Sequence, residues 1–317
     1  MAQRPTHLLQ HRMNMHSLIQ HLVQTAGEVI VGKEHRIRQA VACLLAGGHL
    51  LIEDLPGVGK TTLAHLLAQL LGLQFTRVQF TSDLLPADII GAAIYERDTG
   101  TFRFHPGPIF TQLLLADEIN RATPKAQSAL LEAMEEQQVS AEGETRKLPR
   151  PFVVVATQNP VHQIGTFPLP ESQLDRFLMR IELGYPDHFA ERKVLLGRDR
   201  RVMVNELEPV MNPEQFMDLR RLAEQVHASD ALLDYLQALV EFTRTETRFV
   251  QGLSPRASLA LLRSARAWAF MEGRRHVLPE DLQSVLPAVV THRLRVASGA
   301  ESTADPAAEL LDSVAIP

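Results

Sequence analysis

The segment from His49 to Leu63 contains the residue types and the spacing that bind phosphate. It reads His-Leu-Leu-Ile-Glu-Asp-Leu-Pro-Gly-Val-Gly-Lys-Thr-Thr-Leu, so a short apolar run is followed by a glycine-containing loop and then by a helical pattern. Glycines let backbone N–H groups turn toward an anion, and the N-terminus of the helix adds the positive end of its dipole. We therefore expect Lys60 to reach the β- and γ-phosphates of ATP and the Thr61 hydroxyl to hold Mg²⁺.

The loop departs from the general phosphate-loop pattern at one position. The pattern G-x-x-x-x-G-K-[ST] requires glycine at position 54, where this chain has Asp54. Taken alone, the segment would also suit a glycine-rich turn with an exposed lysine, and the further motifs favour nucleotide binding. A turn shortly upstream of the loop is included in the expected site. The residues expected to contact the nucleotide are Val31, Gly32, Pro56, Gly57, Val58, Gly59, Lys60, Thr61 and Thr62.

A second apolar run ends in two carboxylates. Residues 112–118 read Gln-Leu-Leu-Leu-Ala-Asp-Glu, and a continuously apolar strand suits a parallel sheet that is covered on both faces. Carboxylates at the C-terminal end of such a strand face the crevice where open α/β sheets bind ligands. Asp117 would bind Mg²⁺ through its water shell, because this hard cation prefers oxygen ligands. Glu118 would polarise the attacking water as general base.

Two further polar side chains are candidates for sensing the γ-phosphate. Asn159 follows the apolar run 151–157, and its amide is expected to hold the water between Glu118 and the γ-phosphate. A turn-forming asparagine before a proline is the alternative. Arg256 falls in the first turn of a helix that Ser254 is expected to cap. It is expected to reach the γ-phosphate and to link lid closure to the nucleotide, and a plain surface arginine is the alternative.

Arg176 is a candidate for completing the site of a neighbouring subunit. It stands in Leu-Asp-Arg-Phe, between an expected short helix and an expected strand. An arginine at that edge is expected to project from the surface of the domain. The alternative is a salt bridge within the chain, to Asp175 or Glu171. The intersubunit role would require a ring with heterologous interfaces.

The elements that must position these residues form an α/β domain followed by a helical one. Two inserted hairpins, 93–105 and 139–148, are expected between the strands. After about residue 190, four capped helical patterns follow with no comparable strand signal. The predicted fold class is an α/β core with a parallel sheet between helices, followed by a small all-helical lid. Strands are expected at 50–52, 74–80, 112–118, 151–157 and 178–183.

The same patterns set the expected domain boundaries. The ends of the chain are polar or rich in small residues and are expected to be flexible. The expected parts are a flexible N-terminal tail at 1–15, an α/β nucleotide-binding domain at 16–190, a linker at 191–211, a helical lid at 212–297 and a flexible C-terminal tail at 298–317.

The composition of the chain indicates its expected cellular location and the classes of partner that it is expected to bind. The chain has 317 residues with a formal net charge of −5 and a pI of about 6.2, which argues against a general nucleic-acid binder. Its single cysteine, Cys43, cannot form an internal disulfide. No apolar stretch approaches the length of a membrane span. A reduced, cytoplasmic setting is the expected localisation.

Taken in order, the motifs resemble one family, the MoxR family of AAA+ ATPases, which belongs to the helix-2-insert clade. The likeness covers roughly residues 17–296. The stretches that carry it are Ile-Glu-Asp-Leu-Pro-Gly-Val-Gly-Lys-Thr, Phe-Thr-Ser-Asp-Leu-Leu-Pro-Ala-Asp, Gly-Pro-Ile-Phe, Leu-Leu-Ala-Asp-Glu-Ile-Asn-Arg-Ala, Ala-Thr-Gln-Asn-Pro, Leu-Pro-Glu-Ser-Gln-Leu-Asp-Arg-Phe and Ser-Pro-Arg-Ala.

The resemblance implies a P-loop NTPase core and a role for each candidate residue. Asp54 looks like a substitution that the family accepts, and the two hairpins resemble the helix-2 and pre-sensor-1 inserts, which would project toward a ring pore. The implied roles are Walker A for Lys60 and Thr61, Walker B for Asp117 and Glu118, sensor 1 for Asn159, arginine finger for Arg176 and sensor 2 for Arg256.

Three functional hypotheses follow. The first, which the resemblance favours, is an ATP-driven chaperone: a ring, expected to be a hexamer, that hydrolyses ATP with Mg²⁺ to remodel or activate a client protein, working with a von Willebrand factor A domain protein. The second is a nucleotide-gated binding module, in which the ATP state only switches affinity for a partner. The third is a chelatase-type or DNA-motor subunit, against which the acidic net charge argues.

Overall fold

In the computed structural model of this protein, residues 4–160, 166–295 and 305–316 are described. The chain divides into two compact units. The first comprises residues 1–48, 178–181 and 210–317, and is called the helical unit; the second comprises residues 49–177 and 182–209, and is called the α/β unit. Within the described residues, no helix is both long enough and apolar enough to cross a bilayer.

The sheet of the structure has five strands in the order β2-β5-β8-β1-β9. The pairings of β2 with β5, β5 with β8 and β8 with β1 are all parallel. Residues of β1, β5 and β8 are almost all buried, as the continuous apolar runs predicted. The strands are β1 (Leu50–Glu53), β2 (Phe75–Gln79), β5 (Leu113–Asp117), β8 (Val153–Gln158) and β9 (Met179–Ile181).

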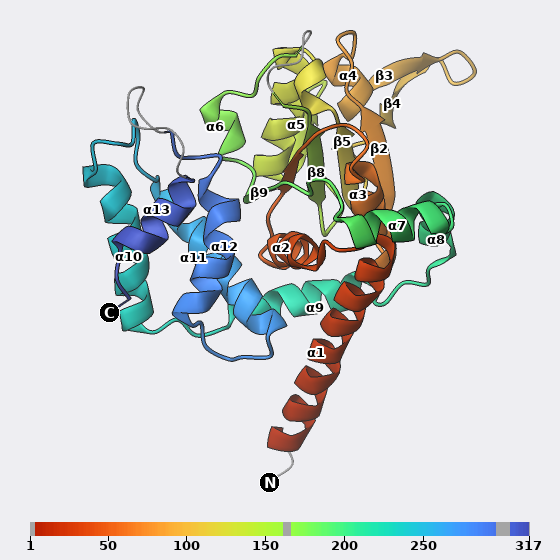
Figure 1. The fold of residues 1–317 in the computed structure, drawn as a ribbon. Helices are drawn as coiled ribbons and strands as arrows, with labels where there is room; N and C mark the ends of the chain where they lie inside the picture. Colours follow the sequence, from red (N-terminus) through yellow and green to blue (C-terminus); the bar gives the residue numbers. More distant parts are fainter. Residues whose placement is uncertain (1–3, 161–165, 296–304, 317) are drawn as a thin grey trace. The chain divides into compact units, whose positions relative to one another are not determined.

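Two helices of the α/β unit cover the sheet (Figure 1). Helix α3 (Lys60–Leu70) packs against β2, β5 and β8. Helix α5 (Pro124–Glu136) begins after Thr123 with Pro124 at N1, as predicted. The face of β5 and β8 that carries Leu114 and Val154 packs in one apolar cluster with Leu130 of α5. Side chains of alternate strand residues therefore point to opposite faces.

Both inserted hairpins are present. The first consists of β3 (Gly91–Glu96) and β4 (Thr101–Pro106), and the second of β6 (Gln138–Ala141) and β7 (Glu144–Lys147). The short helix α4 (Pro86–Ile90) leads into the first hairpin, which extends away from the sheet (Figure 1). Both hairpins are antiparallel. In the sequence, the first lies between β2 and β5 and the second between β5 and β8.

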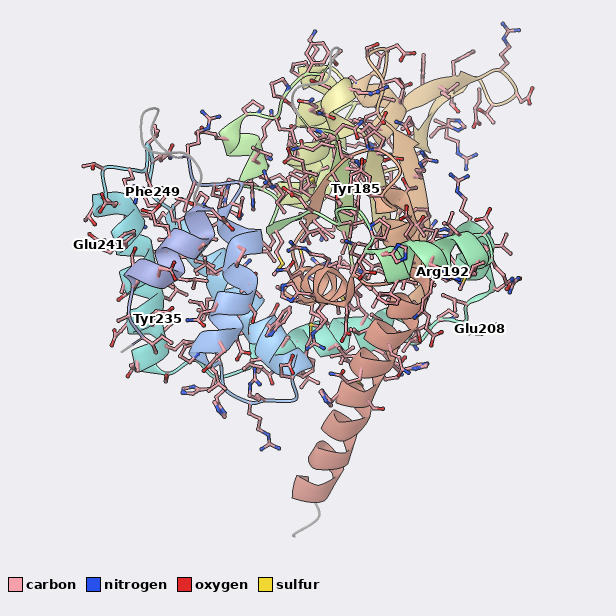
Figure 2. All side chains as sticks on the ribbon, in the orientation of Figure 1. Tyr185, Arg192, Glu208, Tyr235, Glu241 and Phe249 are labelled. Carbon is pink, nitrogen blue, oxygen red and sulfur yellow. The ribbon has the colours of Figure 1, made fainter. Side chains whose placement is uncertain are left out.

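Four helices of the helical unit, which begin at Pro213, Asp230, Pro255 and Pro279, form where the sequence predicted capped helices. Residues 16–48, which were expected in the α/β domain at 16–190, fall in the helical unit instead. Side chains of Asn212, Ser229 and Ser254 accept the N–H groups that begin three of these helices. Tyr235, labelled in Figure 2, lies in the interior of this unit and is 1% exposed. The helices here are α1 (Arg4–Val29), α2 (Glu34–Leu45), α9 (Pro213–Glu224), α10 (Asp230–Thr245), α11 (Pro255–Met271), α12 (Pro279–Val290) and α13 (Pro306–Ser313).

The structure differs from the expected tails. Of the predicted N-terminal tail 1–15, residues 4–15 are part of α1, and residues 1–3 lie outside the described residues. After Pro5, which the first turn tolerates, this stretch contains leucine, glutamine, arginine and methionine, which favour helix. At the other end, residues 306–313 of the predicted tail 298–317 form α13, because Ala307 and Leu310 are fully buried. Residues 298–304 and 317 lie outside the described residues.

The predicted linker 191–211 also differs. It contains most of α7 (His188–Leu196) and all of α8 (Arg200–Glu206), which belong to the α/β unit. Helix α8 packs on α3, and Gln69 donates a hydrogen bond of 2.7 Å to the carbonyl of Leu207. Asp187 and Asp199 cap the two helices with their side chains. Charge along the segment was therefore the sign of solvent-facing helices and not of a linker.

Candidate active site

The glycine loop has the geometry of an anion site. It joins the end of β1 to the start of α3, and Gly57 and Gly59 have φ angles of 85° and 97°, which favour glycine. Gly59 is the N-cap of α3, and no side chain caps the helix. The N–H groups of the first turn of a helix lack acceptors within the helix. They are therefore available to phosphate oxygens, with the positive end of the dipole behind them.

Lys60 begins α3 and is largely buried, with 8% of its surface exposed. Its ammonium donates to Asn159 Oδ1 at 2.9 Å, to the carbonyl of Leu55 at 3.2 Å and to the carbonyl of Asp54. Burial lowers the pKa of Lys60, and the negative charges nearest to it, led by Asp54 and Asp117, oppose that shift. The cation is thus held at the mouth of the loop by neutral oxygens that a phosphate group can replace.

Asp54, the departure from the general pattern, holds the loop in place. Its Oδ1 accepts the N–H of Leu55 at 2.8 Å, and its Oδ2 accepts the N–H of Gly184 at 2.6 Å. The Asp54 residue is 9% exposed. A carboxylate that accepts two backbone N–H groups fixes the start of the loop to the segment after β9. This position therefore needs a side chain that glycine does not have.

Asp117 ends β5 beside the loop and is 5% exposed. Its Oδ1 accepts the hydroxyl of Thr157 at 2.6 Å, and its Oδ2 accepts the hydroxyl of Thr61 at 3.2 Å. Arg77 of β2 donates to the same Oδ2, with Nε at 2.9 Å. A threonine hydroxyl and a carboxylate oxygen side by side are the hard oxygen donors that suit magnesium. Among the described residues, no group of three or more His, Cys, Asp or Glu is placed to hold a metal ion.

Glu118 follows Asp117 and is held in a left-handed backbone conformation, with φ of 56°. Its N–H donates to Thr157 Oγ1 at 2.8 Å. Oε1 accepts the amide of Asn159 at 3.2 Å, and Oε2 accepts the amide of Gln79 at 2.9 Å. This uncommon backbone conformation directs the Glu118 carboxylate away from the Asp117 carboxylate, so the two carboxylates have different hydrogen-bond partners.

The side chain of Asn159 links the cation to the base. It is 2% exposed, accepts from Lys60 and donates to Glu118, and Asn120 donates to its carbonyl at 3.0 Å. The structure thus brings together Lys60, Thr61, Asp117, Glu118 and Asn159, which come from three separate sequence motifs. In chemical terms the group offers an anion-binding loop, a cation site and a base held by an amide.

Four contacting residues were missed by sequence reasoning: Arg77, Gln79, Arg121 and Thr157. Arg121 Nε lies 3.2 Å from Glu118 Oε2. Gln79 lies opposite Asp117 in the register of β2 with β5, and Arg77 shares its face because the two are separated by one residue. The signal for Arg77 and Gln79 was their alternation with the buried Val78, which places both polar side chains on one face of β2. That face can be assigned to the site only once β2 is known to neighbour β5.

Arg176 does not project from the surface as expected. Its Nη2 lies 2.9 Å from Glu135 Oε2, its Nη1 donates to the carbonyl of Leu131, and 29% of its side chain is exposed. Glu135 is more distant in sequence than Asp175 and Glu171, the two carboxylates that sequence proximity suggested. The C-terminal end of α5 attracts this cation, because its last carbonyls and Glu135 are negative. The role of Arg176 in a neighbouring site stays a prediction.

The remaining predicted residues belong to the helical unit. Arg256 is exposed in the first turn of α11, after the Ser254 cap and Pro255, as predicted. Val31 and Gly32 form the turn between α1 and α2, and Gly32 has a φ of 74°. Their contact with a nucleotide stays a prediction.

Comparison with known proteins shows the family to which the chain is similar. Residues 49–179 match the ATPase family associated with various cellular activities (AAA), and residues 241–314 match the AAA lid domain. Uncharacterized protein YeaC of Bacillus subtilis (strain 168) is 45% identical over 281 residues, which cover 89% of this chain and 88% of that protein. Chaperone MoxR1 of Mycobacterium tuberculosis is 40% identical over 275 residues, which cover 84% and 72%.

A solved structure matches nearly the whole chain. It is a crystal structure of a protein assigned as an ATPase from Cytophaga hutchinsonii, with a TM-score of 0.88 and 36% identity over 98% of both chains. Core and lid both match, and a MoxR protein is similar over most of the sequence. The chain therefore belongs to the MoxR family of AAA+ ATPases.

Proposed function

We propose that this protein binds ATP with Mg²⁺ at the loop of Gly57 to Thr61, hydrolyses it, and uses the cycle to remodel client proteins as a chaperone. The observation that carries the proposal is the contact chain from Lys60 through Asn159 to Glu118. It joins the residue that meets the γ-phosphate to the residue that activates water. Chaperone MoxR1 is the printed name of one relative, which supports the second half of the proposal.

Each residue has one task in hydrolysis. Lys60 exchanges its carbonyl and amide partners for oxygens of the β- and γ-phosphates, and the loop N–H groups bind the rest of the charge. Thr61 and Asp117 would hold Mg²⁺, which would supply positive charge to neutralise the charge that develops on the phosphates. Glu118 accepts the proton of the attacking water. Asn159 then orients that water, because its amide already lies within 3.2 Å of Glu118.

The two inserted hairpins supply a surface for a protein client. Tyr95 and Phe102 face each other across the first hairpin with ring centroids 5.3 Å apart, and their exposed fractions are 52% and 74%. Exposed aromatic pairs of this kind suit contact with polypeptide. The N–H of Ala93 donates to Glu142 in the turn of the second hairpin at 3.1 Å, so the two hairpins are in contact.

The ring, its hexameric state and a von Willebrand factor A domain partner belong to the same proposal. A ring gives Arg176 a neighbouring site to complete, if ring assembly draws it away from Glu135. The partner would select the client, since the exposed aromatics recognise apolar polypeptide in general. Mass photometry with ATP and Mg²⁺ would measure the subunit number, and a monomer at all nucleotide conditions would contradict the ring.

The ATPase half is tested with Glu118→Gln. This variant keeps the size and shape of the side chain but removes the base and leaves one accepting oxygen in place of two. Turnover should therefore fall by about 10²- to 10⁴-fold, while ATP binding is retained. A control, Glu144→Gln, changes an exposed glutamate of the second hairpin and should leave turnover unchanged. Equal turnover in Glu118→Gln and the unchanged protein would contradict the assigned role of this base.

The remodelling half is tested apart from hydrolysis. Tyr95→Ser with Phe102→Ser removes the aromatic pair, and Phe189→Ser is the matched control because Phe189 is a 78% exposed phenylalanine of α7. Client protein is identified by capture on Glu118→Gln with ATP, and its activation is then assayed with each variant. Loss of activation with ATPase retained supports remodelling. Unchanged activation would favour the nucleotide-gated binding module instead.

A further inference from the structure

Asp117 Oδ2 accepts hydrogen bonds from more than one donor. Besides the hydroxyl of Thr61 at 3.2 Å, it receives Nε of Arg77 at 2.9 Å, and Nη2 of Arg77 lies 2.7 Å away. Two N–H groups of one guanidinium thus converge on a single carboxylate oxygen. The other oxygen, Oδ1, is already bound to the buried hydroxyl of Thr157. The oxygen beside Thr61 is therefore the one on which a metal-bound water and Arg77 would both depend.

The placement of Arg77 follows from its strand. Arg77 and Gln79 are on the same face of β2, with the inward-facing Val78 between them. Arg77 Nη2 also donates to Gln79 Oε1 at 3.1 Å. The side chain is 49% exposed, so the guanidinium lies at the rim of the site with water on its other side. It can leave Asp117 without breaking the packing of the core.

We propose that Arg77 competes with Mg²⁺ for Asp117, so that it restrains metal loading until the nucleotide brings its own negative charge. This inference rests on the proposed function of the site. A guanidinium and a divalent cation draw on the same oxygen, and like charges at this spacing repel each other. Binding of the metal with ATP moves Arg77 off Oδ2 toward solvent, while Thr61 and Thr157 keep their contacts with Asp117.

If Arg77 only positions Asp117, its removal should change the affinity for the metal in the opposite direction. If Arg77 served only to hold Asp117 in the orientation that the metal requires, its removal would weaken metal binding. If Arg77 competes, its removal strengthens metal binding. The two roles are therefore separated by the direction of one measured change, and that change is read from the metal itself and not from turnover.

The experiment measures Mn²⁺ binding by electron paramagnetic resonance, with protein saturated by the non-hydrolysable analogue AMP-PNP. The variant is Arg77→Met, which removes the charge and keeps an apolar stem at a half-exposed position. The matched control is Arg198→Met, because Arg198 is an exposed arginine that pairs with Glu206 at 2.7 Å away from the site. Affinity for AMP-PNP in EDTA is measured alongside.

We expect Arg77→Met to bind Mn²⁺ about two- to fivefold more tightly, the range for an ion pair with a half-exposed cation. Arg198→Met should match the unchanged protein, and affinity for AMP-PNP in EDTA should not increase in Arg77→Met. Equal or weaker Mn²⁺ binding by Arg77→Met, with its folding intact by circular dichroism, would overturn the competition. Absence of Mn²⁺ binding in the unchanged protein and both variants would overturn the proposed function and this inference with it.

Discussion

Replacement of Asp54 by alanine tests why this chain departs from the phosphate-loop pattern. The carboxylate accepts the N–H groups of Leu55 and Gly184 at 2.8 Å and 2.6 Å. A hydrogen bond to a charged group contributes about 1.5–3 kcal/mol, and two bonds to one carboxylate do not add fully. Asp54→Ala should therefore lower the free energy of unfolding by about 2–4 kcal/mol. For a domain of this size, the melting temperature should fall by about 5–15 °C.

The assay is urea unfolding followed by circular dichroism, with nucleotide removed so that binding does not add to stability. Asp187→Ala is the control, because Asp187 is an exposed N-cap that accepts one N–H group, from Ala190, at 2.8 Å. Asp187→Ala should lower the free energy of unfolding by about 1 kcal/mol. If Asp54→Ala costs no more than this control, the account of Asp54 as the anchor of the loop is refuted.

Three more predictions concern the site. Thr157→Val removes the hydroxyl that donates to Asp117, so it should lower turnover and should lower the free energy of unfolding by about 1–3 kcal/mol. Thr157→Ser keeps a hydroxyl and should restore both quantities, as measured in steady-state assays and urea titrations. Burial lowers the pKa of Lys60, so its affinity for ATP should fall as pH rises through that lowered pKa, below the usual lysine pKa of about 10.4. Lys60→Arg keeps its charge over this range, so its affinity should not fall. In fluorescent-nucleotide titrations, the same pH dependence for both proteins would contradict this prediction. The free energy of unfolding should change in the opposite direction with pH. Between the pKa of Lys60 in the folded protein and its higher pKa in the unfolded chain, the unfolded chain binds more protons, so stability rises with pH. Arg176→Ala should abolish turnover in steady-state assays and Glu135→Ala should not. Equal loss in both variants would show that Arg176 acts through its ion pair with Glu135 of α5.

Much of the site was predictable because its residues follow features that are local in sequence. Asp117 ends an apolar strand, and the loop before Lys60 combines glycine with the start of a helix. Ser254 likewise marks the start of α11, and its side chain accepts the N–H of Ala257 at 3.2 Å. Each of these signals depends on neighbours within a few residues, where chain geometry alone decides the structure.

The contacts that were missed depend on strand order and on packing between distant segments. Arg77 meets Asp117 only because β2 lies next to β5. Arg176 pairs with Glu135 of α5, although Asp175 and Glu171 are nearer in sequence. Ion pairing follows distance in space, and sequence distance is a poor guide to it once a helix packs across a sheet. Residues 4–15 of α1 were predicted as a flexible tail because of their polar composition, which does not exclude a helix.

The central claim is that Lys60 binds the phosphates of ATP, and one titration tests it directly. A fluorescent ATP analogue with Mg²⁺ is added to the unchanged protein and to Lys60→Met, and circular dichroism confirms that both are folded. Loss of a buried, charged hydrogen-bond donor should weaken binding by about 10- to 100-fold. Equal affinity in the two proteins would contradict the account of this loop as the nucleotide site.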